Sequence, residues 1–215
     1  MKRLIIISLG CILCLNAIAQ VDYSYIRREV FLADSLYKSH DVEQSIYHRG
    51  KIIDFFRENR KQCLRDDSLS LLVFESCYVY SNLQISTTDK ILCLDQALCI
   101  VEANPKWVYS YANKQHIVNL YCIYVGYLIE EKQIKEAQRG NKRLLRFAEQ
   151  HYRIGLSDVL LSVGYSYYLM GVPEQSISIF ESLYEMFDEL DKIQQYKVLK
   201  HLINLKFNAK DYEDV

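Results

Sequence analysis

The chain has 215 residues, of which half are hydrophobic, and it contains only seven glycines and two prolines. So few helix-breaking residues, together with long runs of apolar residues at helical spacing, predict an almost wholly helical protein. Its 26 basic and 27 acidic residues nearly balance, which gives no electrostatic reason to expect nucleic acid or an anionic membrane surface as a partner.

Residues 1–19 have the features of a secretory signal peptide. Lys2 and Arg3 form a basic start, an apolar run follows, and Ala17-Ile18-Ala19 is an A-x-A cleavage site. We therefore expect export to the periplasm or the medium and a mature protein that begins at Gln20 and does not insert into a membrane. The alternative is an uncleaved membrane anchor, since the apolar run approaches the short end of the spanning length.

The first half of the chain predicts two helical hairpins. The turn of the first one is at His40, and Pro105 ends the second because proline cannot continue a helix. The helices are expected at Tyr23–Lys38, from the turn at His40 to about Arg60, at Leu69–Leu83, and at Lys90–Ala103 with capping residues in Ser86-Thr87-Thr88-Asp89.

The second half begins with Trp107–Glu130, which is apolar on most faces. This segment predicts either one extended helix or a short helix that leads into Val118–Glu131. A turn at Lys132 precedes a helix that continues to His151. The last predicted helix is Tyr196–Ala209, and the residues after it look like the start of another.

Between these, Ser157–Leu190 has the clearest pattern. Apolar or small residues at Leu160, Val163, Gly164 and Tyr167 form the stripe of one amphipathic helix. Gly171-Val172-Pro173 then interrupts the pattern, because proline starts helices more readily than it continues them. A second stripe follows, so the stretch predicts a helical hairpin; its positions are Ser176, Ile177, Phe180, Leu183, Tyr184 and Phe187.

The spacing within this hairpin resembles a tetratricopeptide repeat (TPR). In the first helix, Val163-Gly164 occupies the position of the Leu-Gly pair of the repeat and Tyr167 that of its tyrosine. Gly171 occupies the position of the turn glycine. In the second helix, Ser176 and Phe180 occupy the positions of the small and the aromatic residue. The turn at His40 is followed by the same Glu-Gln-Ser-Ile sequence as the turn at Gly171, which indicates that the first hairpin has the same register.

The resemblance implies an all-α fold, a right-handed α-α superhelix of about four helical hairpins plus a partial fifth. Because the turn markers are 39 residues apart or more, the 34-residue TPR period is not kept and other helical-pair solenoids remain open. The domain is expected over residues 20–215, with units at about 26–59, 68–105, 107–151 and 157–190 and a partial unit at 196–215.

Five cysteines remain after the predicted cleavage. Their spacing matches no zinc-binding pattern, and most lie in apolar helical runs, where cysteine acts as a small buried side chain. We expect buried thiols, with Cys63–Cys77 as the most plausible disulfide; the five are Cys63, Cys77, Cys93, Cys99 and Cys122.

No sequence pattern supports catalysis. The chain lacks the metalloprotease, nucleophile-elbow, P-loop and dinucleotide-binding motifs. The histidines are scattered, and no two are spaced for a helical metal site. We therefore expect no enzyme activity, no metal and no cofactor. The five histidines are His40, His48, His116, His151 and His201.

One helical face is basic. Lys135, Arg139, Lys142, Arg143 and Arg146 recur every three or four residues. Such a stripe could hold an acidic partner. The resemblance, however, makes this the second helix of a hairpin, with its charged side outward on the convex surface, so we interpret the stripe as a solvated face.

The 18 tyrosines suggest a different site. In the TPR register, Leu161, Tyr165, Tyr168 and Leu169 face the concave groove, where tyrosine offers contact area and a hydroxyl to a ligand. The alternative is that these rings fill gaps between repeats. The resemblance adds Lys200 and Asn204, at positions that in some TPR domains clamp a carboxylate.

These patterns predict an exported scaffold that binds a protein or peptide. The alternative is the input part of a longer signalling protein, such as a periplasmic sensor of a histidine kinase or transcriptional regulator. The apolar stripe Leu199, Leu202, Ile203 and Phe207 of the last helix further predicts an exposed edge that self-associates or is covered by residues beyond 215.

Overall fold

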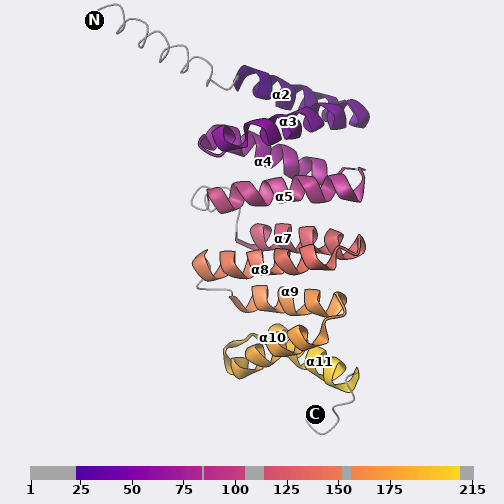
Figure 1. Cartoon of the computed structure of the whole chain (residues 1–215), viewed down its shortest axis with the longest axis vertical. Helices are drawn as coiled ribbons and strands as arrows, with labels where there is room; N and C mark the ends of the chain where they lie inside the picture. Colours follow the sequence, from indigo (N-terminus) through magenta and orange to yellow (C-terminus); the bar gives the residue numbers. More distant parts are fainter. Residues whose placement is uncertain (1–22, 84, 105–113, 152–155, 209–215) are drawn as a thin grey trace, which may run out of the picture. The chain divides into compact units, whose positions relative to one another are not determined.

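A computed structural model describes residues 23–83, 85–104, 114–151 and 156–208 (Figure 1). The predicted signal peptide, Trp107 and residues 209–215 lie outside the described residues. Within them the chain forms nine α-helices, one 3-10 turn and no strand, which confirms the all-α class. No described helix combines the length and the apolar character that crossing a bilayer would require.

The chain divides into two compact units, Met1–Tyr80 and Ser81–Val215. The first contains α2 (Tyr23–Lys38), α3 (Val42–Cys63) and α4 (Asp67–Ser81). Helices α2 and α3 pack as a hairpin. Polar contacts also join them, because Glu29 is buried against His48 at 2.7 Å and the buried Arg49 contacts Asp34 at 2.5 Å.

The described residues of the second unit form six α-helices, each of which packs against the next one described. They are α5 (Thr87–Ala103), α7 (Lys114–Glu130), α8 (Ile134–His151), α9 (Leu156–Leu169), α10 (Pro173–Glu185) and α11 (Lys192–Asn208), with a 3-10 turn at Phe187–Glu189. Helix α9 also contacts α7 and α11 directly. Helices α7, α9 and α11 therefore form one layer of this unit, and α8 and α10 pack behind it. This consecutive packing fits a helical solenoid.

Three hairpin turns have one local geometry. His40, Lys132 and Gly171 all adopt the left-handed conformation, with φ values of 65°, 58° and 70°. In each turn this residue donates its N–H to the carbonyl three residues back, and the next N–H donates to the carbonyl five residues earlier, at 2.8–3.1 Å. This is the Schellman ending, which satisfies carbonyls that the helix would otherwise leave unpaired.

The first and last of these hairpins share a further contact. Ser45 Oγ donates to the carbonyl of Ala33 at 2.9 Å, and Ser176 Oγ donates to that of Gly164 at 2.8 Å. Both serines are fully buried, so each hydroxyl finds its partner on the facing helix. The two helices also approach each other closely at Gly164, because an added Cβ there would lie 3.1 Å from the ring of Phe180.

The core of the C-terminal end lies between α9, α10 and α11. The last helix begins four residues earlier than the sequence predicts, because the carboxylate of Asp191 accepts the N–H groups of Ile193 and Gln194 at 2.8 Å and caps it. The buried side chains of this core are Leu161, Phe180, Leu183, Leu190, Val198, Leu202 and Leu205.

The outer side of α11 is apolar and exposed. Ile193 and Tyr196 lie 67% and 64% exposed, and Leu199, Ile203 and Phe207 are exposed as well. Leu202 differs from the prediction: it points the other way and is buried in the core. Three of the four residues of the predicted stripe, Leu199, Ile203 and Phe207, are therefore exposed on α11, and Leu202 is not.

All five described cysteines are thiols rather than disulfides, so Cys63 and Cys77 are not bridged. Burial raises the pKa of Cys63 to about 11 and that of Cys93 to about 12. These thiols therefore stay protonated at neutral pH and pack as small apolar groups.

Candidate functional site

A pocket of about 280 Å³ opens between α7 and α9, with α8 behind it. Its walls are formed by Cys122, Val125, Gly126 and Ile129 of α7, Asn141 and Leu144 of α8, and Ser162, Tyr165, Ser166 and Leu169 of α9. The periodicity of helices explains this set: the α7 and α9 residues recur at intervals of three or four, so each helix presents one face to the space between them.

The pocket has a polar wall without charge. Asn141 is 2% exposed and its amide exchanges hydrogen bonds with Ser166 Oγ at 3.0 and 3.2 Å. Ser162 donates to the carbonyl of Asp158 at 2.9 Å. Burial raises the pKa of the Cys122 thiol, although a hydrogen bond with Ser162 partly opposes this shift. The pocket therefore offers hydroxyl, amide and thiol groups, all neutral at pH 7.

An aromatic cluster adjoins the pocket. The rings of Tyr165 and Tyr168 stack at 6.2 Å, and the imidazole of His201 on α11 lies 5.3 and 6.2 Å from them. On its other side His201 stacks on Phe180 at 4.9 Å. Burial lowers the pKa of His201, and the neighbouring Lys200 and Lys197 lower it further, so the imidazole is neutral at pH 7.

The residues predicted for the concave face are brought only partly together. Tyr165 and Leu169 line the pocket, and Tyr168 lies in the aromatic cluster beside it. Leu161 is 8% exposed and belongs to the core between α9, α10 and α11, so its side chain is not available to a ligand there. Helix periodicity placed it on the right helix but could not distinguish these two faces.

The two remaining predicted residues lie on α11. Lys200 and Asn204 are exposed, and the ammonium group of Lys200 lies 6.0 Å from the ring of Tyr196. Neither residue lines the pocket.

Sequence reasoning missed most of the pocket. Gly126 and Asn141 were not identified because each fits an ordinary helix, and Cys122 was predicted only as a buried thiol. One signal was present: Asn141 is a polar residue on the apolar face of α8 between Ala137 and Leu144, and a buried amide needs a partner.

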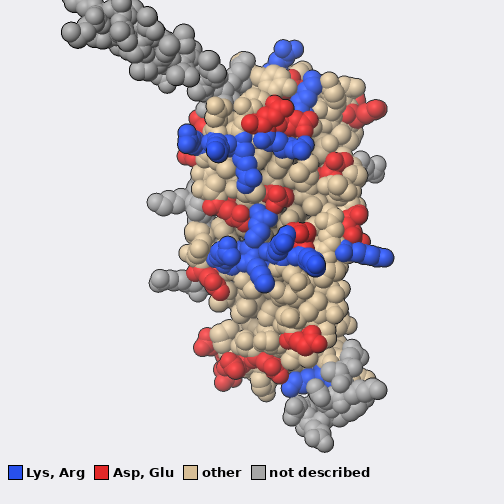
Figure 2. Space-filling model, viewed as in Figure 1, with Lys and Arg blue, Asp and Glu red and all other residues tan. Residues whose placement is uncertain are grey.

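The basic stripe lies over α8, where Figure 2 shows blue side chains gathered among red ones. Arg139 is 72% exposed and pairs with Glu136 in the preceding turn at 2.5 Å; Lys135, Lys142 and Arg146 are exposed too. Arg143 is the exception, because its side chain is only 26% exposed. The stripe is thus a solvated face with one member turned inward.

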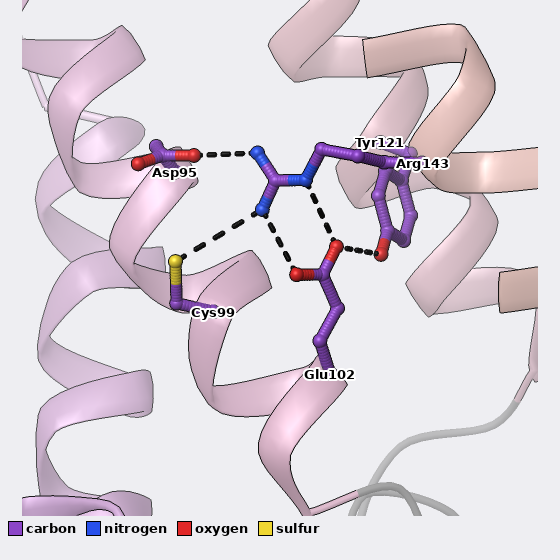
Figure 3. A network of polar contacts seen from close by, with 5 residues as sticks. All are labelled: Asp95, Cys99, Glu102, Tyr121 and Arg143. Atoms are coloured by element: carbon purple, nitrogen blue, oxygen red, sulfur yellow. Dashed lines mark hydrogen bonds and ion pairs between the residues drawn. The ribbon is translucent and has the colours of Figure 1, made fainter. Parts of the chain in front are cut away.

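Arg143 connects three helices (Figure 3). Its guanidinium contacts Asp95 of α5 at 2.6 Å and holds both carboxylate oxygens of Glu102 at 2.9 and 3.2 Å. Glu102 also accepts the hydroxyl of the fully buried Tyr121 of α7 at 2.7 Å. Burial acts to lower the pKa of Arg143, but the bonds to Glu102 and Asp95 outweigh it and raise the pKa above its usual value.

This network is structural. Burial, followed by the charge of Glu102, raises the pKa of Tyr121 far above its usual value, and burial raises that of Tyr124 to about 12. Neither phenol can therefore act as an acid or base near neutral pH, and these two tyrosines serve as core rings that join α7 to its neighbours.

Among the described residues, no group of three or more His, Cys, Asp or Glu side chains could hold a metal ion. The pocket between α7 and α9 is our candidate binding site. Comparison with protein-family models found no match to this chain, and the search of curated proteins found none either.

Proposed function

We propose that this protein is a non-catalytic binding module that holds a peptide or a protein segment against the α7–α9–α11 layer of its second unit. The observation that supports this most directly is the pocket between α7 and α9, with Tyr165 at its margin and Tyr168 and His201 beside it. Rigid aromatic side chains next to an apolar pocket are the features that concentrate binding energy at protein interfaces.

The size of the pocket admits a side chain of a partner. Its volume of about 280 Å³ is close to the lower limit of about 300 Å³ for sites of drug-sized molecules. An anchor side chain of the partner enters this space, and the rest of the partner then lies across the exposed tyrosines. Tyr165 is 45% exposed and Tyr168 is 38% exposed.

The architecture we propose for the whole is TPR-like. The shared turn geometry at His40, Lys132 and Gly171 supports repetition of one hairpin design. In a right-handed array of such hairpins, α7, α9 and α11 would each be the first helix of a hairpin, and these first helices would line the inner surface. An experimental structure of the mature protein tests this, and a left-handed or unrepeated arrangement of the hairpins would disprove it.

We propose that the module works outside the cytoplasm, on the basis of the signal peptide that residues 1–19 resemble. Mass spectrometry of the exported protein should find Gln20, or its cyclised form, at the N-terminus. Recovery of the chain with Met1 intact in the membrane fraction would contradict this.

Selection from a random peptide library displayed on phage tests the binding function. The purified protein should enrich peptides that bind it, and replacement of both Tyr165 and Tyr168 by alanine should weaken their binding. Neutralising Arg139, Lys142 and Arg146 of α8 is the matched control, since these side chains lie on a different helix from the tyrosines and do not line the pocket. If no peptide is enriched, or if only the α8 control weakens binding, the proposed function is wrong.

A further inference from the structure

We infer that Gly126 determines which partner this site accepts: its missing side chain keeps open a pocket for one uncharged apolar anchor residue of a bound peptide. This inference rests on the proposed function and adds to it the chemical class of the anchor and the residue that selects it.

Neither the backbone nor the packing requires a glycine at this position. Gly126 lies inside α7, without the positive φ that favours glycine at Gly171, and an added Cβ would meet no atom within 4 Å. Gly140 differs, because there an added Cβ would lie 2.7 Å from Val125 Cγ2. A glycine in a helix interior is destabilising relative to alanine, so folding alone does not account for Gly126.

The empty space beside Gly126 belongs to the pocket, because Gly126 is one of the residues that line it. Any side chain at 126 would begin at the pocket wall and extend into that space. The volume available to a ligand therefore depends directly on residue 126, whereas the other lining positions already contribute side chains to the walls.

The chemistry of the walls specifies the occupant. None of the lining residues is charged, and moving an ionised side chain from water into such a site is unfavourable unless a counter-charge awaits it. The occupant is therefore a neutral apolar side chain such as those of leucine, methionine or phenylalanine. The Asn141–Ser166 pair remains satisfied within the protein, so the occupant does not have to supply a hydrogen bond.

The experiment uses peptides selected from the phage library on the unmodified protein. Their common position is replaced in synthetic peptides by Phe, Leu, Ala, Lys or Asp, and dissociation constants are measured by calorimetry. We expect the unmodified protein to bind the Phe or Leu peptides at least about tenfold more tightly than the Ala, Lys or Asp peptides, because even one methylene in an apolar pocket changes affinity by about tenfold or more.

Gly126→Ala should narrow the pocket and reduce the affinity for the largest anchor by about tenfold, while the affinity for the Ala peptide changes by less than about twofold. Gly126→Leu should abolish the preference among anchors. Gly50→Ala in α3 is the matched control, since its added Cβ also has room, 3.9 Å from the hydroxyl of Tyr80. All three variants should melt at or above the temperature of the unmodified protein, which excludes unfolding as the cause.

The outcomes are distinguishable. Peptides that bind Gly126→Leu as tightly as the unmodified protein, or that prefer a charged residue at the common position, would overturn this inference and leave the proposed function standing. Indole serves as a small-molecule probe of the pocket. If indole binds the unmodified protein but not Gly126→Leu, while peptide affinity is the same for both proteins, the inference would also be overturned, because the occupant would then be a small molecule. If no peptide is enriched at all, both the inference and the proposed function are wrong.

Discussion

Replacement of Arg143 by methionine should destabilise the second unit more than any other single charge removal on α8. Methionine keeps an unbranched apolar stem and removes only the guanidinium. The change breaks the contacts to Asp95 and to both oxygens of Glu102, and it leaves Glu102 with the hydroxyl of Tyr121 as its remaining partner in this network.

The magnitude follows from geometry and exposure. A hydrogen bond to a charged group contributes about 1.5–3 kcal/mol when it is well shielded, whereas an exposed ion pair contributes about 0–1 kcal/mol. Arg143, Asp95 and Glu102 are 26%, 40% and 35% exposed, which places them between these limits. We expect a loss of about 1–3 kcal/mol in the free energy of unfolding, or a decrease of about 1 M in the urea midpoint.

Arg139→Met is the matched control, since Arg139 lies on the same helix, is 72% exposed and pairs with Glu136 one turn away. Its replacement should change stability by less than about 0.5 kcal/mol. Urea unfolding followed by circular dichroism compares the two variants, and hydrogen exchange should show faster exchange in α5 and α8 for Arg143→Met alone. Equal midpoints for the two variants would refute the reasoning, because the cost of burying the charges would then cancel their attraction.

Three further predictions follow from particular side chains. Gly140→Ala should lower the melting temperature, whereas Gly126→Ala should maintain or raise it; both gain helix propensity, so the difference measures the 2.7 Å clash at position 140 alone. NMR titration should give His201 a pKa below 6.5; because the unfolded chain then takes up the proton first, stability should fall as the pH drops below about 6.5, and a His201→Phe variant should lack this loss. Alanine at both Tyr165 and Tyr168 should weaken peptide binding by about tenfold or more in calorimetry, and unchanged affinity would exclude the aromatic cluster from the interface.

The sequence alone was sufficient to predict the described helices to within a few residues and three of the turns between them. His40, Lys132 and Gly171 were identified as turn positions, and all three adopt the left-handed conformation. The reason is that these signals are local. A stripe of apolar residues indicates a helix, and a proline such as Pro173 or an interruption of the stripe indicates a helix end, each within a few residues of sequence. Where local signals competed, as at the start of α11, the capping side chain of Asp191 decided the boundary.

The candidate site depended on tertiary structure. Leu161 and Tyr165 lie on the same helix and one turn apart, yet one is buried in the core and the other lines a pocket, because the neighbouring helices decide which face each side chain meets. Arg143 belongs to a basic stripe in the sequence and to a network across three helices in the structure. Gly126 shows most clearly what the sequence could not predict. The pocket beside it is formed by side chains of three helices, so no pattern within α7 alone could have revealed the pocket.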